Sequence, residues 1–230
     1  MTGTLINAGA IVAAGFIGLL LKRGIPDNMS RNMQDALGIL VILIGIQCAL
    51  KGENYALIGV SLALGAVLGE WRQWEEKLEG LGRKLEKRLA GEGESDFVKG
   101  FVSATLLFCV GAMAIIGALE DGLTGNYQIL LVKSMLDGIF ALLFAASMGM
   151  GVLFSAIPVF IYQGSISLAA SFIKPLLTDP MINNITATGG ILIMGLGINL
   201  VGLKKIKVAN LLPSVFLVPL LMAMVKVLGF

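Results

Sequence analysis

Two opposite charges lie one helical turn apart in the stretch VKSMLDGIF, residues 132–140. Lys133 and Asp137 are four residues apart, a spacing that brings an ammonium and a carboxylate together on one face of a helix. In so apolar a stretch, a carboxylate can serve as a proton site, a cation ligand or the partner of a charged substrate. We expect Asp137, with Ser134 beside it, either to handle a substrate or ion or to form a structural pair with Lys133.

Four amide side chains, those of Asn7, Gln47, Gln163 and Asn199, also lie in apolar segments. An amide in an apolar medium is costly when its donors and acceptors are unpaired, so these side chains should face protein or water. They are expected either to line a polar site or to join helices by hydrogen bonds.

Several other chemistries lack the residues that they need. The chain has no His, which removes the usual zinc motifs and catalytic triads, and it contains neither a Walker-type loop nor a GxSxG sequence. Cys48 and Cys109 lie in apolar segments, where a free thiol behaves as a small apolar group. We therefore expect no cofactor, metal, disulfide framework or catalytic residue. An enzyme acting on lipid would have only Ser134 as a nucleophile.

The composition explains why these polar residues stand out. Of the 230 residues 57% are apolar and 14% charged, and the mean hydropathy is +0.89, which is typical of a membrane protein. A spanning helix needs about 20 mostly apolar residues. The sequence predicts eight such segments, at 4–21, 33–50, 56–70, 97–119, 128–148, 152–173, 184–203 and 208–228.

The basic residues predict the orientation of these segments. If the N-terminus is outside, only Lys51, Lys174 and Lys226 remain on the outer side; Lys133 lies within the membrane and every other Lys or Arg is cytoplasmic. Because basic residues in short loops are retained in the cytoplasm, we expect both termini outside the inner membrane. Lys133 would then lie near the outer surface and extend its ammonium to the headgroups.

The longest polar excursion, residues 71–96, contains a predicted amphipathic helix. Its apolar residues recur at spacings of three and four, which form one stripe on a helix: Trp71, Trp74, Leu78, Leu81, Leu85 and Leu89. This pattern predicts a helix on the cytoplasmic membrane surface. The same stripe would also suit a contact with a second copy or a partner.

An internal repeat gives the most specific signal. GILVILIGIQ (38–47) matches GILIMGLGIN (190–199) at an offset of 152, which pairs Gln47 with Asn199. Upstream, residues 13–21 match 169–177 at an offset of 156, a register that pairs Asn7 with Gln163. Helices one to three would then correspond to helices six to eight, and a displacement of five helices inverts the second copy. The alternative is that the repeat records only gene duplication.

Helix breaks are expected to supply backbone groups to a site in such a fold. The positions predicted for them are Gly189-Gly190, Pro158, Pro213 and Pro219.

Several motifs together resemble the bacterial inner-membrane family of unknown function that includes YqgA and YdfK. They are GTLINAGAI (3–11), the two GIL segments, GAMAIIGALEDGLTG (111–125), KSMLDG (133–138) and IYQG (161–164). The similarity extends over nearly the whole chain. It implies a multi-pass plasma-membrane protein of a kind commonly labelled a transporter, and it implies no substrate, cofactor or catalytic residue.

The sequence therefore predicts an all-α integral membrane protein with one membrane domain over residues 1–230. Repeat one spans 4–70, the cytoplasmic helix and linker 71–96, a central helix pair 97–148 and repeat two 152–228. The expected function is a transporter or channel for a small polar or ionic solute, whose partners are membrane lipids and that solute rather than nucleic acid. The alternative is a regulator or assembly scaffold that works through the 71–90 helix, or a homo-oligomer that pairs through it.

Overall fold

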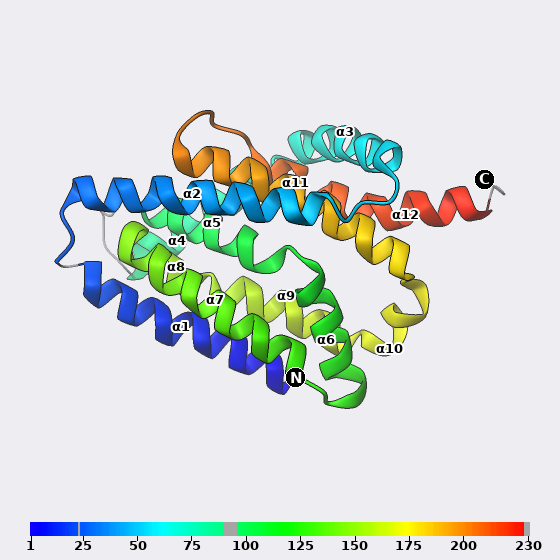
Figure 1. Ribbon diagram of the computed structural model, residues 1–230, viewed down its shortest axis with the longest axis horizontal. Coiled ribbons are helices and arrows are strands. Elements are labelled where there is room, and N and C mark those ends of the chain that lie inside the picture. Colours follow the sequence, from blue (N-terminus) through cyan, green and yellow to red (C-terminus); the bar gives the residue numbers. More distant parts are fainter. Residues whose placement is uncertain (23, 90–95, 228–230) are drawn as a thin grey trace. The chain divides into compact units, whose positions relative to one another are not determined.

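The computed structural model describes residues 1–22, 24–89 and 96–227, which form helices and no strands, as the sequence predicts. The helices of the first half are α1 (Thr2–Lys22), α2 (Asp27–Ala49), α3 (Tyr55–Arg72), α4 (Trp74–Leu89), α5 (Phe97–Cys109) and α6 (Ala112–Thr124) (Figure 1). Those of the second half are α7 (Gln128–Met148), α8 (Gly151–Phe154), α9 (Ala156–Leu168), α10 (Ala170–Ile173), α11 (Asp179–Val201) and α12 (Pro213–Val227). Two short 3₁₀ helices, η1 (Lys174–Leu176) and η2 (Val208–Leu211), precede α11 and α12.

The count of eight membrane spans is not confirmed. Within the described residues, six helical stretches are long and apolar enough to cross a bilayer: 2–22, 27–49, 128–148, 151–168, 179–201 and 208–225. The pair α5 and α6 makes a seventh if it is one span bent by 63°. The segment predicted at 56–70 forms α3, which is not among the six and ends in the polar residues Glu70 and Arg72.

The predicted helix breaks differ from those in the structure. Helix α11 continues through Gly189-Gly190, while Pro158 and Pro219 lie inside α9 and α12, and Pro213 begins α12. The central segment is broken instead between α5 and α6, where Gly111 has a φ of 140° that favours glycine. The segment predicted at 152–173 is also interrupted, at Ser155 and Ala169.

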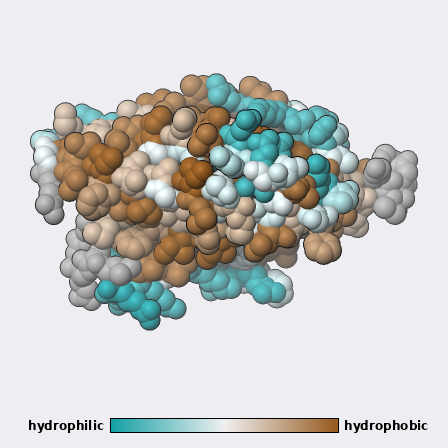
Figure 2. All heavy atoms as spheres, turned by 90° about the horizontal axis from the view of Figure 1, so that it is seen from below, coloured by the Kyte–Doolittle hydropathy of each residue, from teal (hydrophilic) through white to brown (hydrophobic). Residues whose placement is uncertain are grey.

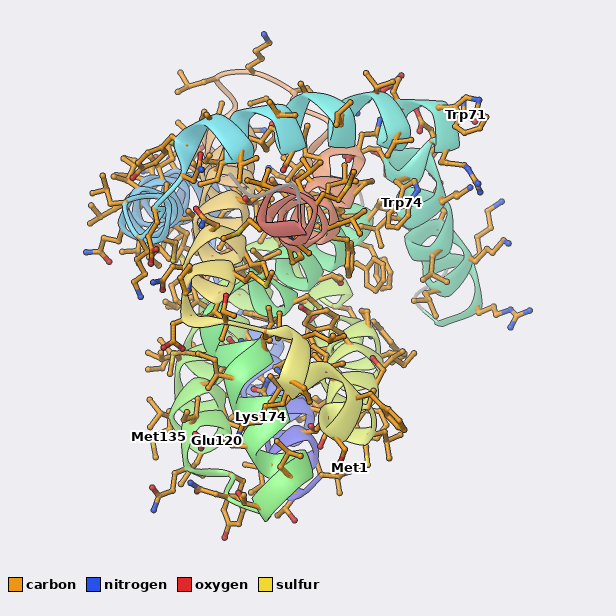
Figure 3. All side chains as sticks on the ribbon, turned by 90° about the vertical axis from the view of Figure 1, so that its right-hand side faces the viewer. Met1, Trp71, Trp74, Glu120, Met135 and Lys174 are labelled. Atoms are coloured by element: carbon orange, nitrogen blue, oxygen red, sulfur yellow. The ribbon has the colours of Figure 1, made fainter. Side chains whose placement is uncertain are left out.

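Large apolar side chains lie on the outside of many helices. Met135 of α7 is 64% exposed and points away from its helix (Figure 3), and Phe16, Phe172 and Phe216 are exposed in the same way. Figure 2 shows broad hydrophobic areas on one face of the molecule. Such surfaces are stable against lipid, whereas in water they would favour aggregation.

The chain divides into two compact units, which we describe separately. Unit 1 contains residues 1–37, 79–109 and 113–174, and unit 2 contains 38–78, 110–112 and 175–230. In unit 1, α1 and α7 run side by side in parallel (Figure 1). Glycines make this contact close: a Cβ at Gly3 would lie 2.7 Å from Leu130 Cβ, and one at Gly18 would overlap the carbonyl of Leu142.

In unit 2, α2 and α11 cross in opposite directions at two pairs of glycines. A Cβ added at Gly190 would lie 2.6 Å from the Gly45 carbonyl oxygen, and one at Gly45 would lie 2.7 Å from that of Gly190. Gly38 and Gly197 face each other in the same way. A Cβ added at Gly38 would lie 3.1 Å from the Gly197 carbonyl oxygen, and one at Gly197 would lie 2.7 Å from that of Gly38. The offset of 152 found in the sequence pairs Gly38 with Gly190 and Gly45 with Gly197. Exchanging the residues of each pair turns one contact into the other.

The predicted 71–90 helix is divided by a corner at Gln73, whose φ of 51° ends α3 before α4 begins. Trp71 belongs to α3, is 75% exposed and points outward (Figure 3). On α4, Leu81 is exposed, Leu78 and Leu85 are half-buried and Glu75 is buried. The location of this helix on the membrane surface stays a prediction. The linker residues 90–95 lie outside the described residues.

The glycine crossing in unit 2 yields a stability prediction. Gly190→Ala places a methyl group against backbone atoms of α2, so we expect it to destabilise the folded protein by about 1–3 kcal/mol and lower its melting temperature in detergent. Gly59→Ala is the matched control, because a Cβ there meets nothing within 4 Å. Equal melting temperatures for the two variants would contradict the crossing.

Candidate functional site

A cluster of two charges and two amides lies inside unit 1. Lys133 Nζ donates a hydrogen bond of 2.6 Å to Asp137 Oδ2, and Asn7 Nδ2 donates to the same oxygen at 3.0 Å. Asn7 Nδ2 also donates to Gln163 Oε1 at 3.2 Å. Three helices, α1, α7 and α9, thus bring together four of the residues that the sequence singled out.

The spacing of residues on α7 explains how the charges come to point inward. Positions three and four apart share a helix face, and the face of Asp137 also carries small residues that let α1 approach. All of it is buried: Ser134, Asp137, Gly138, Ala141 and Ala145. The opposite face carries Met135, Leu136 and Ile139, which are exposed.

The Lys133 side chain does not extend in the predicted direction. Its ammonium was expected to reach the outer headgroups, yet the residue is only 6% exposed and its Nζ is bound to Asp137. The long side chain bends toward the carboxylate of the following turn instead of extending to the surface. A buried ion pair results, with the negative oxygen further stabilised by the Asn7 amide.

Helix α5 also lies in unit 1, where it packs against α7 and α9. It ends at Cys109.

The amides of the cluster are only partly satisfied. Asn7 and Gln163 are fully buried, yet Asn7 Oδ1 and Gln163 Nε2 have no hydrogen-bond partner within the described parts of the chain. One of these atoms is an acceptor and the other a donor. An unpaired polar atom in an apolar interior is costly, so these two atoms lower the stability of the cluster as it stands.

A second level of polar groups lies one helical turn away along α1. Gly3 N–H donates to Asp121 Oδ2 at 3.0 Å, and the amino group of Met1 lies 3.0 Å from Oδ1 of the same carboxylate. Gly3 and Asn7 are four residues apart, so the two carboxylates contact α1 at points about 6 Å apart along its axis. Buried hydroxyls at this level, Thr4 Oγ1 and Ser167 Oγ, also have no partner in the described chain.

Comparisons with known proteins agree on one family. Residues 2–223 match the family described as protein of unknown function (DUF554). The chain belongs to this family. It is similar to the uncharacterized membrane protein YdfK of Bacillus subtilis (strain 168), at 35% identity over 233 residues that cover 100% of this chain and 99% of YdfK. It is also similar to the uncharacterized protein YqgA of Escherichia coli (strain K12), at 34% identity over 222 residues, covering 94% and 93% of the two chains.

No solved structure matches the chain. Together with the apolar helices, the relationship to YdfK identifies this DUF554 protein as a multi-pass membrane protein.

Three of the predicted site residues are not in the hydrogen-bonded cluster. The side chain of Asn199 exchanges two hydrogen bonds with the backbone of Ile206, both 2.7 Å long, and so fixes the turn after α11. Gln47, its partner in the repeat, is exposed on α2. Ser134 is buried beside Asp137, but its hydroxyl donates to the carbonyl oxygen of Leu130 at 2.6 Å.

The sequence reasoning missed the level of Asp121, Thr4 and Ser167. The fourth apolar segment was ended at residue 119, which left Asp121 in an outer loop, whereas α6 continues to Thr124 and buries it. The rule that drew attention to Asp137, a carboxylate next to an apolar run, would have found Asp121 as well.

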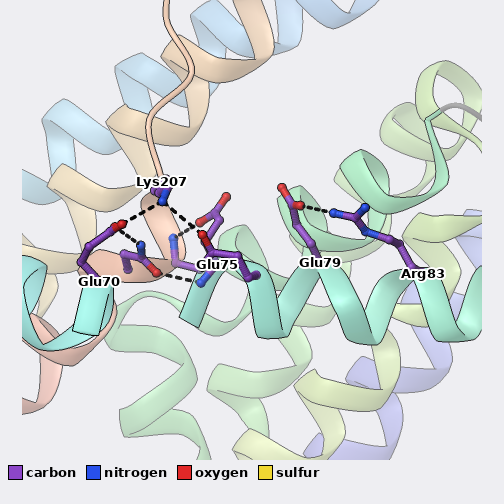
Figure 4. A network of polar contacts seen from close by, with 8 residues as sticks. Glu70, Glu75, Glu79, Arg83 and Lys207 are labelled. Atoms are coloured by element: carbon purple, nitrogen blue, oxygen red, sulfur yellow. Dashed lines mark hydrogen bonds and ion pairs between the residues drawn. The ribbon is translucent and has the colours of Figure 1, made fainter. Parts of the chain in front are cut away.

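A separate polar network in unit 2 fixes the start of α4 (Figure 4). Asn210 accepts from Glu75 N–H at 2.7 Å and donates to Glu70, while Glu75 accepts from Ala209 N–H at 2.8 Å. Lys207 bridges Glu70 and Glu76. A hydrogen bond from its own backbone, followed by that from Lys207, lowers the pKa of Glu76, and both glutamates raise the pKa of Lys207. Glu76 and Lys207 are therefore both ionised throughout the neutral range.

The buried pair yields a stability prediction. Asp137→Asn leaves the Lys133 ammonium without its counter-ion, so we expect a loss of about 3–5 kcal/mol, seen as a lower melting temperature in detergent. The double variant Asp137→Asn, Lys133→Met should recover most of this loss because neither charge remains.

Asp35→Asn and Lys174→Met are the controls, because both residues are exposed and their melting temperatures should not change. A double variant no more stable than Asp137→Asn would contradict the coupling between the two charges.

Proposed function

We propose that this protein is a transporter or channel of the bacterial plasma membrane, through which a small polar or ionic solute passes at the Asp137 cluster. The observation that carries the proposal is the burial of two opposite charges and two incompletely bonded amides among apolar helices. Ionisable residues within membrane segments are costly and typically mark substrate or ion pathways.

A purely structural role explains less of this arrangement. A pair that only held α7 in place would be most stable with every donor and acceptor satisfied. Here the polar atoms without partners lie next to the charges, on Asn7 and Gln163, and continue at Thr4 and Ser167. These atoms support a polar route rather than a sealed contact.

The bent pair of α5 and α6 supports the same proposal. Interrupted membrane helices leave backbone groups without intrahelical partners, and such breaks are tolerated where they line a cavity or a binding site. Helix α5 packs against α7 and α9, the helices that carry Lys133, Asp137 and Gln163, and it ends at Cys109.

We also propose that the protein is an inverted three-helix repeat, with helices one to three related to helices six to eight. The reciprocal contacts of Gly38 with Gly197 and Gly45 with Gly190 support it, because two-fold related elements meet in this manner. In unit 1, Asn7 donates to Gln163, its counterpart at the offset of 156. Folds of this type bind solutes where their two copies meet.

Other functions have less support. A regulator or scaffold would work through α4, whose exposed Leu81 offers it a small apolar surface. An enzyme acting on lipid would need an activated Ser134, and that hydroxyl donates its hydrogen bond to the Leu130 carbonyl oxygen. We therefore propose neither as the primary function.

Flux through the purified protein in liposomes tests the proposal. We expect the wild type to pass at least one member of a panel of small ions and polar solutes, and Asp137→Asn, Lys133→Met to lower that flux at least tenfold while remaining folded. Removal of α4 should leave flux intact. Wild-type flux in the double variant would remove the cluster from the pathway.

Reporter fusions test the proposed orientation, which rests on the distribution of Lys and Arg. A fusion at residue 27 should report a cytoplasmic position and one within 122–125 an external position. A third informative position, 91–95, is predicted to be cytoplasmic and lies outside the described residues. A cytoplasmic signal at 122–125 would contradict both the orientation and the repeat.

A further inference from the structure

We infer that the solute is a small zwitterion that carries one ammonium and one carboxylate group, as an amino acid does. The inference rests on the proposed function and adds the chemical class of the solute. It follows from the juxtaposition of a buried ion pair, Lys133 and Asp137, with one unpaired acceptor on Asn7 and one unpaired donor on Gln163.

The charges of the cluster exclude a simple preference for ions of one sign. Lys133 Nζ lies 2.6 Å from Asp137 Oδ2, so the positive and negative charges of this buried pair cancel. A lone cation bound to Asp137 would be repelled by the adjacent ammonium, and a lone anion on Lys133 would be repelled by the carboxylate. A solute with both charges meets an opposite charge at each end and leaves the balance unchanged.

The amides extend this complementarity. Asn7 Nδ2 is bonded to Asp137, so Asn7 Oδ1, which belongs to the same amide group, lies near the carboxylate as a second acceptor for an ammonium. Gln163 uses Oε1 to accept from Asn7, which leaves Nε2 free to donate to a carboxylate alongside Lys133. Each end of a zwitterion would thus find one charged group and one amide atom of matching polarity.

A neutral polar solute would bind only some of the polar groups of the site. A hydroxyl or amide compound would satisfy Asn7 Oδ1 and Gln163 Nε2, but it would leave Lys133 and Asp137 paired with each other. A buried ion pair contributes little net stability compared with apolar residues of similar volume. The presence of the pair is explained if each member serves as the counter-ion of the other until the zwitterion separates them.

Uptake of glycine into proteoliposomes is the test, with Na⁺, K⁺, Cl⁻ and glycerol as comparison probes. We expect glycine uptake without electrical current, because a zwitterion moves no net charge. Asp137→Asn should lower glycine uptake at least tenfold and favour Cl⁻, since the positive charge remains. Lys133→Met should lower it equally and favour the cations.

Further variants separate binding from folding. The double variant Asp137→Asn, Lys133→Met keeps the charge balance and should remain folded but take up no glycine. Gln163→Met removes the unpaired Nε2 donor together with the Oε1 acceptor of Asn7, and it should raise the glycine concentration needed for half-maximal uptake. Asp35→Asn and Lys174→Met, which change exposed charges by the same chemistry, should keep uptake within twofold of the wild type.

The outcomes distinguish this inference from the proposed function. Flux of ions or glycerol without glycine uptake would overturn the zwitterion and leave a transporter or channel. Glycine uptake that is unchanged in the folded double variant would also overturn it. If a folded, monodisperse wild-type protein passes none of the probes or of the wider solute panel, both proposals fail.

Discussion

The burial of Lys133 and Asp137 inside unit 1 determines how the two charges are arranged. A buried charge must be paired and hydrogen-bonded, because the solvation that it loses is large. For this reason the Lys133 side chain folds back until its Nζ lies 2.6 Å from Asp137 Oδ2, and Asn7 donates a second hydrogen bond to the same oxygen.

The pair in turn requires helices that approach one another very closely. Asn7 reaches Asp137 because α1 lies directly against α7, where Gly3 and Gly18 place backbone next to side chains and carbonyl groups. Close glycine contacts also occur in unit 2, where a Cβ at Gly45 or at Gly190 would meet backbone atoms of the other helix.

Much of this arrangement was predictable from periodicity. The helical fold and the buried face of α7 follow from spacing. The offset of 156 pairs Asn7 with Gln163 in the sequence, and in the structure a hydrogen bond joins the two side chains. The Lys133 side chain is long enough for its ammonium to reach either the membrane surface or Asp137. The packing of the neighbouring helices decides which of the two it contacts, and the sequence alone does not show that packing.

The helix breaks and the pair Gln47 and Asn199 were harder to predict. Neighbouring helices can accommodate Gly and Pro, so Gly189-Gly190 and Pro219 remain helical, whereas Gly111 marks a break. Two residues at equivalent repeat positions also meet different neighbours once the loops differ. Asn199 holds the turn at Ile206, a contact that no offset in the sequence encodes.

The contacts that α1 makes with α7 and with α9 differ in how completely their polar groups are paired. Toward α7, the polar groups are paired: Lys133 and Asn7 Nδ2 both donate to Asp137. In the described part of the chain, the unpartnered side-chain atoms next to the cluster lie on α1 and α9, namely Thr4 Oγ1, Asn7 Oδ1, Gln163 Nε2 and Ser167 Oγ, and Thr105 Oγ1 of α5 is unpartnered as well. Lipid offers these atoms neither donors nor acceptors, so leaving them unpaired is costly. Helix α1 is continuous and packs closely on α7, whereas α9 begins after Ser155 and ends before Ala169. The contact of α1 with α7 therefore holds the charges in place, and the unpaired amide atoms lie on Asn7 and Gln163, where α1 meets α9.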